Sequence, residues 1–159
     1  MPNHRAWTLL AMMCLLVTTA PTIGRAADLQ KYSFMVFSNP VEGKTRDYER
    51  WYRGQHIHDI LQLEGFVAAQ FYQLADIQTR SAPPKYRYLM IWEIETSNLN
   101  AVFDRMRKGM DDGSIVMSPA FDNSPAASVF QAVSRRVTSQ EVRGKSPDQV
   151  FKMTLLQSK

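Results

Sequence analysis

Four segments of the chain are rich in apolar and aromatic residues that favour β-strands, and one of them has two clearly distinct faces. The clearest is 86–95, with Tyr86, Tyr88, Met90, Trp92 and Ile94 on one face and Arg87, Leu89, Ile91, Glu93 and Glu95 on the other. The other three are expected at 31–38, 66–74 and 128–137. Asn39-Pro40 ends the first strand, because proline cannot donate to a strand ladder.

Helical spacing predicts two helices between these strands. The first begins at Thr45, a residue type that caps helices well, and ends at about 61–63, just before Gly65. The second is capped by Thr96, Ser97 or Asn98 and ends within 109–113. Its apolar residues at helical spacing are Leu99, Val102, Phe103, Met106 and Met110.

The resulting order, βαββαβ, predicts an α+β fold of the ferredoxin-like type, with one antiparallel sheet and two helices on one face. The other face of the sheet would be bare, yet strand 86–95 carries large apolar residues on both faces. We therefore expect a homodimer that packs sheet against sheet, a dimeric α/β barrel. The loop at 115–127 could act as a lid, 138–149 looks like a linker, and 150–157 could be a strand, a helix or a docked tail.

The N-terminus has the pattern of an export signal. His4 and Arg5 precede an almost uncharged apolar run at 6–20, and cleavage after Ala26 fits the small-residue rule best. We expect a signal peptide at 1–26, a dimeric α/β-barrel domain at 27–137 and a C-terminal extension at 138–159. The protein would then be exported, and periplasmic in a Gram-negative host. Cleavage would also remove Cys14, the one cysteine of the chain.

Charge excludes one class of partner. The chain has a formal net charge of +4, and removal of 1–26 would leave 17 basic and 15 acidic residues. That balance is too even for the basic footprint of a nucleic-acid-binding protein. After cleavage we also expect no membrane association, since the apolar run at 6–20 is too short for a comfortable span.

The first helix carries unusual chemistry on the stripe that should face the sheet. Buried polar groups are costly unless they are satisfied, so this stripe indicates either a polar network or a site. Its members at helical spacing are Tyr48, Trp51, Tyr52, Gln55, His56, Asp59, Ile60 and Leu63.

His56 and Asp59 are spaced i, i+3, so their side chains could meet. Asp59 would then fix the tautomer of His56, which would act as an acid or a base near neutral pH. Tyr52 could donate a hydrogen bond to a substrate oxygen. The alternative is a buried His–Asp–Tyr network that only ties the helix to the sheet.

A metal site is not expected. His58 lies about 200° around an α-helix from His56, so the two rings cannot reach one ion unless Gly54 ends the helix early. The chain without 1–26 offers no third histidine and no cysteine as a further ligand. We predict no metal and no cofactor.

Three segments together resemble the EthD-like branch of the dimeric α/β-barrel superfamily: Phe37-Ser38-Asn39-Pro40, Trp51-Tyr52-x-x-x-His56-x-x-Asp59-Ile60-Leu61 and Gly65-Phe66-Val67-Ala68-Ala69-Gln70. The resemblance covers 31–137 and departs at His58 and in the C-terminal extension. It implies a homodimer with a pocket in each subunit between sheet and helices. It also implies a dehydratase, cyclase or isomerase that acts without cofactor on a small aromatic or polyketide-like molecule.

The leading hypothesis is an exported lyase or isomerase that binds a small aromatic or apolar molecule. His56 would be the acid or base, Asp59 its orienting partner and Tyr52 the donor to substrate. Substrate contacts would come from Gln55, Trp51, Tyr88, Trp92 and Asn39. The alternatives are a non-catalytic periplasmic binding protein, a purely structural protein, and a cofactor-less or haem-type monooxygenase. Asn39, Trp92 and His56 invite the last comparison, although their order along the chain differs from that of such enzymes.

Overall fold

The structure is a computed structural model that describes residues 28–79, 82 and 84–155. Its strands are β1 (Gln30–Ser38), β2 (Phe66–Gln73), β3 (Tyr88–Thr96) and β4 (Ala126–Gln131). Its helices are α1 (Thr45–Trp51), the π-helical turn η1 (Tyr52–His56), α2 (Ile57–Leu61), α3 (Leu99–Asp112), α4 (Ser139–Val142) and α5 (Pro147–Leu155). The predicted signal peptide at 1–26 lies outside the described residues. No helix among the described residues is long and apolar enough to cross a membrane.

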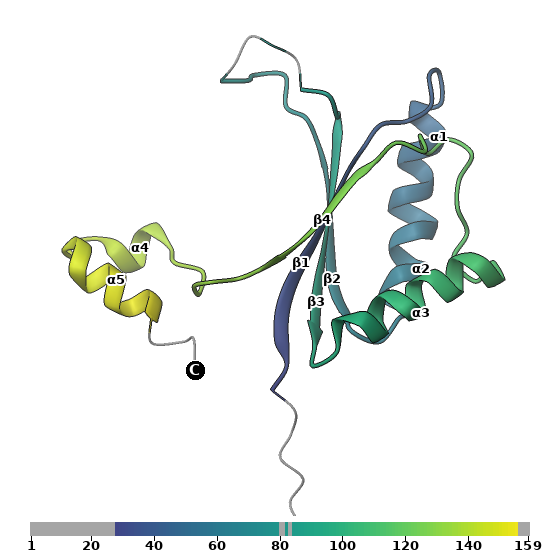
Figure 1. Ribbon diagram of the computed structural model, residues 1–159. Coiled ribbons are helices and arrows are strands. Elements are labelled where there is room, and N and C mark those ends of the chain that lie inside the picture. The colour runs from purple at the N-terminus through teal and green to yellow at the C-terminus, as the bar shows by residue number, and fades with distance from the viewer. Residues whose placement is uncertain (1–27, 80–81, 83, 156–159) are drawn as a thin grey trace, which may run out of the picture.

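The four strands form one antiparallel sheet in the order β2-β3-β1-β4. Helices α1, α2 and α3 lie together on one face of it (Figure 1). The predicted α+β class and βαββαβ order are therefore confirmed. The structure contains a single chain, so the predicted dimer stays a prediction.

The core lies between this sheet and its helices. Inward side chains of β3 alternate as predicted, and Met90, Trp92 and Ile94 are all buried. Tyr48 of α1 and Val102 of α3 close the core from the helix side, each with no exposed surface. The chain turns from α2 into β2 at Gly65, whose φ of +102° and close approach to Val102 exclude a side chain.

The strand prediction at 86–95 was wrong at its start. β3 begins at Tyr88, and the Tyr86 ring lies against Phe37, with 6.2 Å between their centroids. Phe37 pairs with Leu89, so Tyr86 lies on the face opposite Tyr88. Asn39 causes this change, because its Oδ1 accepts the Arg87 amide at 2.8 Å in place of a ladder bond.

The C-terminal segment differs from its prediction too. β4 ends at Gln131 instead of reaching 137, and the linker expected at 138–149 contains α4 and the start of α5. Arg135 holds these pieces together through an ion pair to Glu141 and a bond to the Met153 carbonyl. Both short helices lie apart from the sheet (Figure 1).

The face of the sheet opposite α1–α3 is open. Its apolar side chains include Phe37, Tyr72 and Phe130, which are 37%, 41% and 51% exposed. A contiguous apolar surface of this kind marks a binding face in soluble proteins. The sequence-based expectation of one bare, apolar sheet face thus agrees with the structure.

Candidate functional site

A π-helical turn interrupts the first helix at Tyr52–His56. Its wider spacing is visible at Ile57, whose N–H donates to the carbonyl of Tyr52, five residues earlier. Single π-turns inside α-helices occur disproportionately at functional sites. The turn keeps Tyr52 and His56 buried but rotates Gln55 outward, where it is exposed. The predicted inward position of Gln55 was therefore wrong.

His56 lies inside an aromatic enclosure. The Trp51 ring stacks on the imidazole at 4.3 Å, and Tyr52 and Trp92 present edge contacts at 5.2 and 5.6 Å. Only 6% of His56 remains exposed. Three predicted site residues, Trp51, Tyr52 and Trp92, are thus brought together around His56.

Burial controls the charge of this imidazole. Desolvation lowers the pKa of His56 from 6.5 to about 4, and the nearby charge of Asp59 opposes that shift only in part. The ring is therefore neutral at physiological pH. Its Nδ1 is buried and has no hydrogen-bond partner among the described residues. An unmet buried polar atom is destabilising by about 1–3 kcal/mol, so native proteins rarely retain one without a role.

Asp59 does not orient His56, which corrects the predicted His56–Asp59 pair. Its Oδ1 accepts from Gln55 Nε2 at 2.7 Å and from His58 Nδ1 at 3.4 Å. Its Oδ2 accepts the Val116 amide at 3.2 Å. Burial raises the pKa of Asp59, but these hydrogen bonds outweigh it and the net pKa lies below its usual value. The carboxylate is committed to the loop that follows α3.

That loop forms a strap, residues 114–121, across the first helix. The Val116 carbonyl accepts Trp51 Nε1 at 2.7 Å, while its amide is held by Asp59. Ile115 and Ala120 are each only 2% exposed, which anchors both ends of the strap in the core. Since Trp51 and Asp59 flank His56 along the helix, the strap closes the region beside the imidazole.

Buried phenols occupy the rest of this layer. Burial raises the pKa of Tyr52 to about 12, and its ring stacks on Phe71 at 4.6 Å. Tyr88 donates to Glu49 Oε1 at 2.8 Å, away from His56. The Tyr48 hydroxyl and Ser38 Oγ share a bond of 2.7 Å.

Sequence reasoning did not include Ser38 or Glu49 among the site residues. Ser38 follows Phe34 and Val36 on the inward face of β1, so its polar side chain at that register was the available clue.

Asn39 is a structural clamp. Its Nδ2 donates to the Lys85 carbonyl at 2.9 Å, and its Oδ1 accepts the Arg87 amide. The Asn39 side chain therefore joins the end of β1 to the start of β3, and its hydrogen bonds go to Lys85 and Arg87 and not to Trp92 or His56. The constellation suggested by comparison with monooxygenases is not assembled. Among the described residues no group of three His, Cys, Asp or Glu side chains is placed to hold a metal ion, and His58 is exposed.

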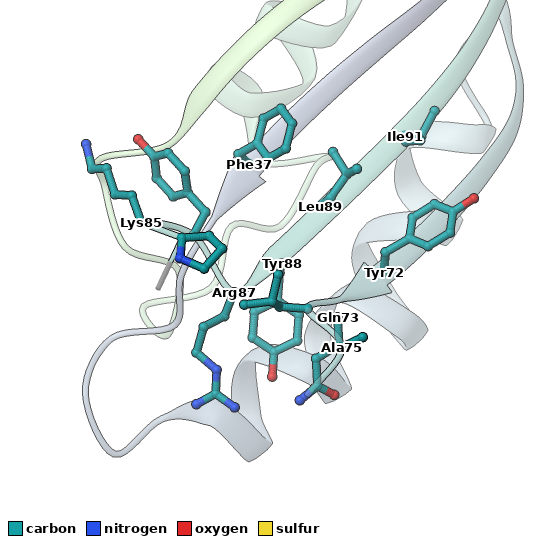
Figure 2. Close-up of a pocket in the computed structure, with 12 residues that line it drawn as sticks. Phe37, Tyr72, Gln73, Ala75, Lys85, Arg87, Tyr88, Leu89 and Ile91 are labelled. Carbon is teal, nitrogen blue, oxygen red and sulfur yellow. The ribbon is translucent and has the colours of Figure 1, made fainter. Parts of the chain in front are cut away.

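A pocket of about 480 Å³ lies on the open face of the sheet, at the ends of β1 and β2. Figure 2 shows Phe37, Tyr72, Leu89 and Ile91 on one side of the strands, with Gln73, Arg87 and Tyr88 directed to the other. His56 does not line this pocket. This pocket therefore lies on the face opposite the one on which a cavity was expected between sheet and helices. The alternation at 86–95 did not reveal this pocket, because that pattern placed Tyr86 on the same face as Tyr88.

Comparison with solved structures finds the same fold elsewhere. An EthD-like protein from Ralstonia eutropha aligns with a TM-score of 0.51 and 14% identity, over 67% of this chain and 96% of that one. An ethyl tert-butyl ether D family protein from Bacillus halodurans gives 0.46 and 12%, over 65% and 98%. A candidate monooxygenase from Shewanella loihica gives 0.46 and 9%, over 67% and 98%. No family model and no curated protein matches the chain.

Replacing His56 with phenylalanine tests the burial of the neutral ring. Between pH 6.5 and about 4 the unfolded chain takes up a proton that the folded chain refuses, so stability falls as the pH is lowered. This loss is at most about 3 kcal/mol and ends near pH 4. His56→Phe should fold as stably as the wild type at pH 7 or better, and lack this loss. Denaturant unfolding from pH 7.5 to 4 measures the stability at pH 7 and its loss at lower pH. A variant whose stability falls with pH as steeply as that of the wild type would contradict the burial of a neutral His56 ring.

Proposed function

We propose that this chain, which has the fold of EthD-like proteins, binds a small aromatic or apolar molecule that carries one polar atom, with neutral His56 as the hydrogen-bond partner of that atom. The observation that carries the proposal is the buried, unpaired Nδ1 of His56 at a π-helical turn. A ligand oxygen would satisfy this nitrogen, and the surrounding rings would hold the apolar body of the ligand.

Access to His56 is controlled by the strap in this proposal. Two hydrogen bonds hold the Val116 backbone over the helix, one from Trp51 and one to Asp59. Breaking two such bonds requires about 1–3 kcal/mol in total, which a ligand can supply when it binds the open form more tightly. The loop that the sequence suggested as a lid would then act as one.

Export of the mature chain and its assembly into a sheet-to-sheet homodimer belong to the same proposal. The export pattern of 1–26 supports the first. The apolar open face of the sheet supports the second.

Binding can be measured with 2-naphthol, an aromatic molecule with one uncharged hydroxyl. We expect saturable binding by calorimetry and a change in tryptophan fluorescence, since Trp51 and Trp92 both contact His56. His56→Phe should weaken binding about fivefold, the worth of one neutral hydrogen bond. The matched control is His58→Gln, two residues along the chain and exposed, which should bind as the wild type does.

Equal affinity of wild type and His56→Phe for 2-naphthol would contradict the assignment of His56. Binding that is lost in His58→Gln would contradict it as well, because that ring lies outside the aromatic enclosure.

Proton transfer at His56 is the second candidate function, favoured by the neutral ring with its unpaired Nδ1. An imidazole in this state can accept a proton from the carbon next to a carbonyl, leaving an enolate. Returning the proton to the same carbon or to a neighbouring one completes an exchange or an isomerisation. Dehydratase and isomerase chemistry both begin with such a step.

Exchange of the α-protons of 2-tetralone in deuterated water, followed by proton NMR, tests this chemistry. The rate should rise as the pH increases through about 4 and stay level above it, because the basic form of His56 is then fully populated. His56→Phe should slow the exchange by about 100-fold or more. Saturable binding of 2-tetralone without exchange would leave the protein a carrier, and a rate that titrates near pH 6.5 would assign the chemistry to another group.

A further inference from the structure

The pocket on the open face has the size and lining of a small-molecule site. Its volume of about 480 Å³ lies within the range of about 300–1,000 Å³ that such sites occupy. Three aromatic side chains, Phe37, Tyr72 and Tyr86, and two aliphatic ones, Leu89 and Ile91, contribute to its wall. Figure 2 shows Phe37, Leu89 and Tyr72 on one side of three neighbouring strands.

Most polar groups of the wall are already paired. The Tyr72 hydroxyl donates to Gln70 Oε1 at 2.6 Å, and the Tyr86 hydroxyl donates to the Ser124 carbonyl at 3.3 Å. The Asn39 side chain uses both of its ends on the backbone of Lys85 and Arg87. These bonds fix the wall in place and leave its aromatic faces toward the hollow.

Two cationic side chains belong to the lining, and Figure 2 shows that Arg87 is directed to the other side of the strands. The remaining one is Lys85. Its Nζ lies 4.9 Å from the centroid of the Tyr86 ring, which places the cation at the edge of the pocket. Within the part of the chain that the structure describes, Lys85 makes no ion pair. An apolar pocket with one unpaired cation at its rim is complementary to an apolar molecule with one acidic group.

We propose that this pocket binds a small aromatic carboxylate, with its ring system against Phe37 and Tyr86 and its carboxylate at Lys85 Nζ. The site is separate from His56, which lies on the other face of the sheet. A second chain packed over the open face would shield the bound ring from water without providing the recognition. The proposal therefore stands independently of the one for His56.

The probes are 2-naphthoate and its neutral analogue 2-naphthamide, titrated into the full chain by calorimetry at low ionic strength. The wild type should bind naphthoate more tightly than naphthamide. Lys85→Gln should weaken naphthoate binding about tenfold, the worth of one charge-assisted hydrogen bond, and leave naphthamide unchanged. Lys108→Gln, which removes an exposed lysine from α3, is the matched control and should bind both probes as the wild type does.

Leu89→Trp is the second variant, because it fills the hollow from the start of β3. It should abolish binding of both probes while its thermal unfolding remains cooperative. His56→Phe should leave naphthoate binding unchanged, so that failure of this site and failure of the His56 site can be told apart.

Three outcomes would overturn the proposal. They are equal affinity of the wild type for the two probes, unchanged naphthoate binding in Lys85→Gln, and the absence of binding at millimolar probe.

Discussion

The enclosure of a neutral imidazole beneath the strap is the constraint on which this structure depends. The ring neighbours of His56 are all aromatic, and burial lowers its pKa to about 4 against the opposing effect of the Asp59 charge. A protonated ring there would be an unpaired buried charge, which proteins avoid by shifting the pKa or by supplying a partner. In this protein the pKa is shifted, and Asp59, the nearest carboxylate along the helix, accepts a hydrogen bond from the Val116 amide instead.

The two faces of the sheet serve different purposes as a result. The helix-covered face is filled by rings, with Tyr48, Tyr52, Phe71 and Tyr88 in mutual contact. The opposite face keeps a hollow whose wall is held by the Asn39 clamp. Any ligand beside His56 must displace the strap, whereas a ligand on the open face meets a preformed surface. Affinity at the first site therefore includes the free energy of opening, and at the second it does not.

Much of the fold could be predicted from the sequence because its signals are local. The alternation that buries Met90, Trp92 and Ile94 is a property of neighbouring residues, and it places the central strand and its helix-facing side correctly. The same alternation failed at Tyr86, because an amide from Asn39, 47 residues earlier, takes the backbone out of the ladder before β3 begins. Long-range side-chain bonds of this kind leave no period in the sequence.

The sequence predicted which residues make up the candidate site, but not how all of them are oriented and bonded. Tyr52 and His56 are four residues apart and share one face of a helix, so their burial followed from their positions. Trp51 and His56 are about 140° apart on an α-helix, and in the structure their rings stack at a π-helical turn. The orientation of Gln55 depended on the pitch of the helix, and the hydrogen bonding of Asp59 depended on the strap that packs against it. The π-helical turn moved Gln55 outward, and the Val116 amide, 57 residues further on, captured Asp59. Neither effect is encoded near the residues that it changes.

A pH titration of the His56 ring by NMR, with nitrogen-15 in the imidazoles, tests the central claim most directly. The enclosure predicts that the His56 nitrogens keep the shifts of a neutral ring down to about pH 4. Titration of His56 near 6.5 would show a solvated ring, and the account of the strap and the unpaired nitrogen would be wrong.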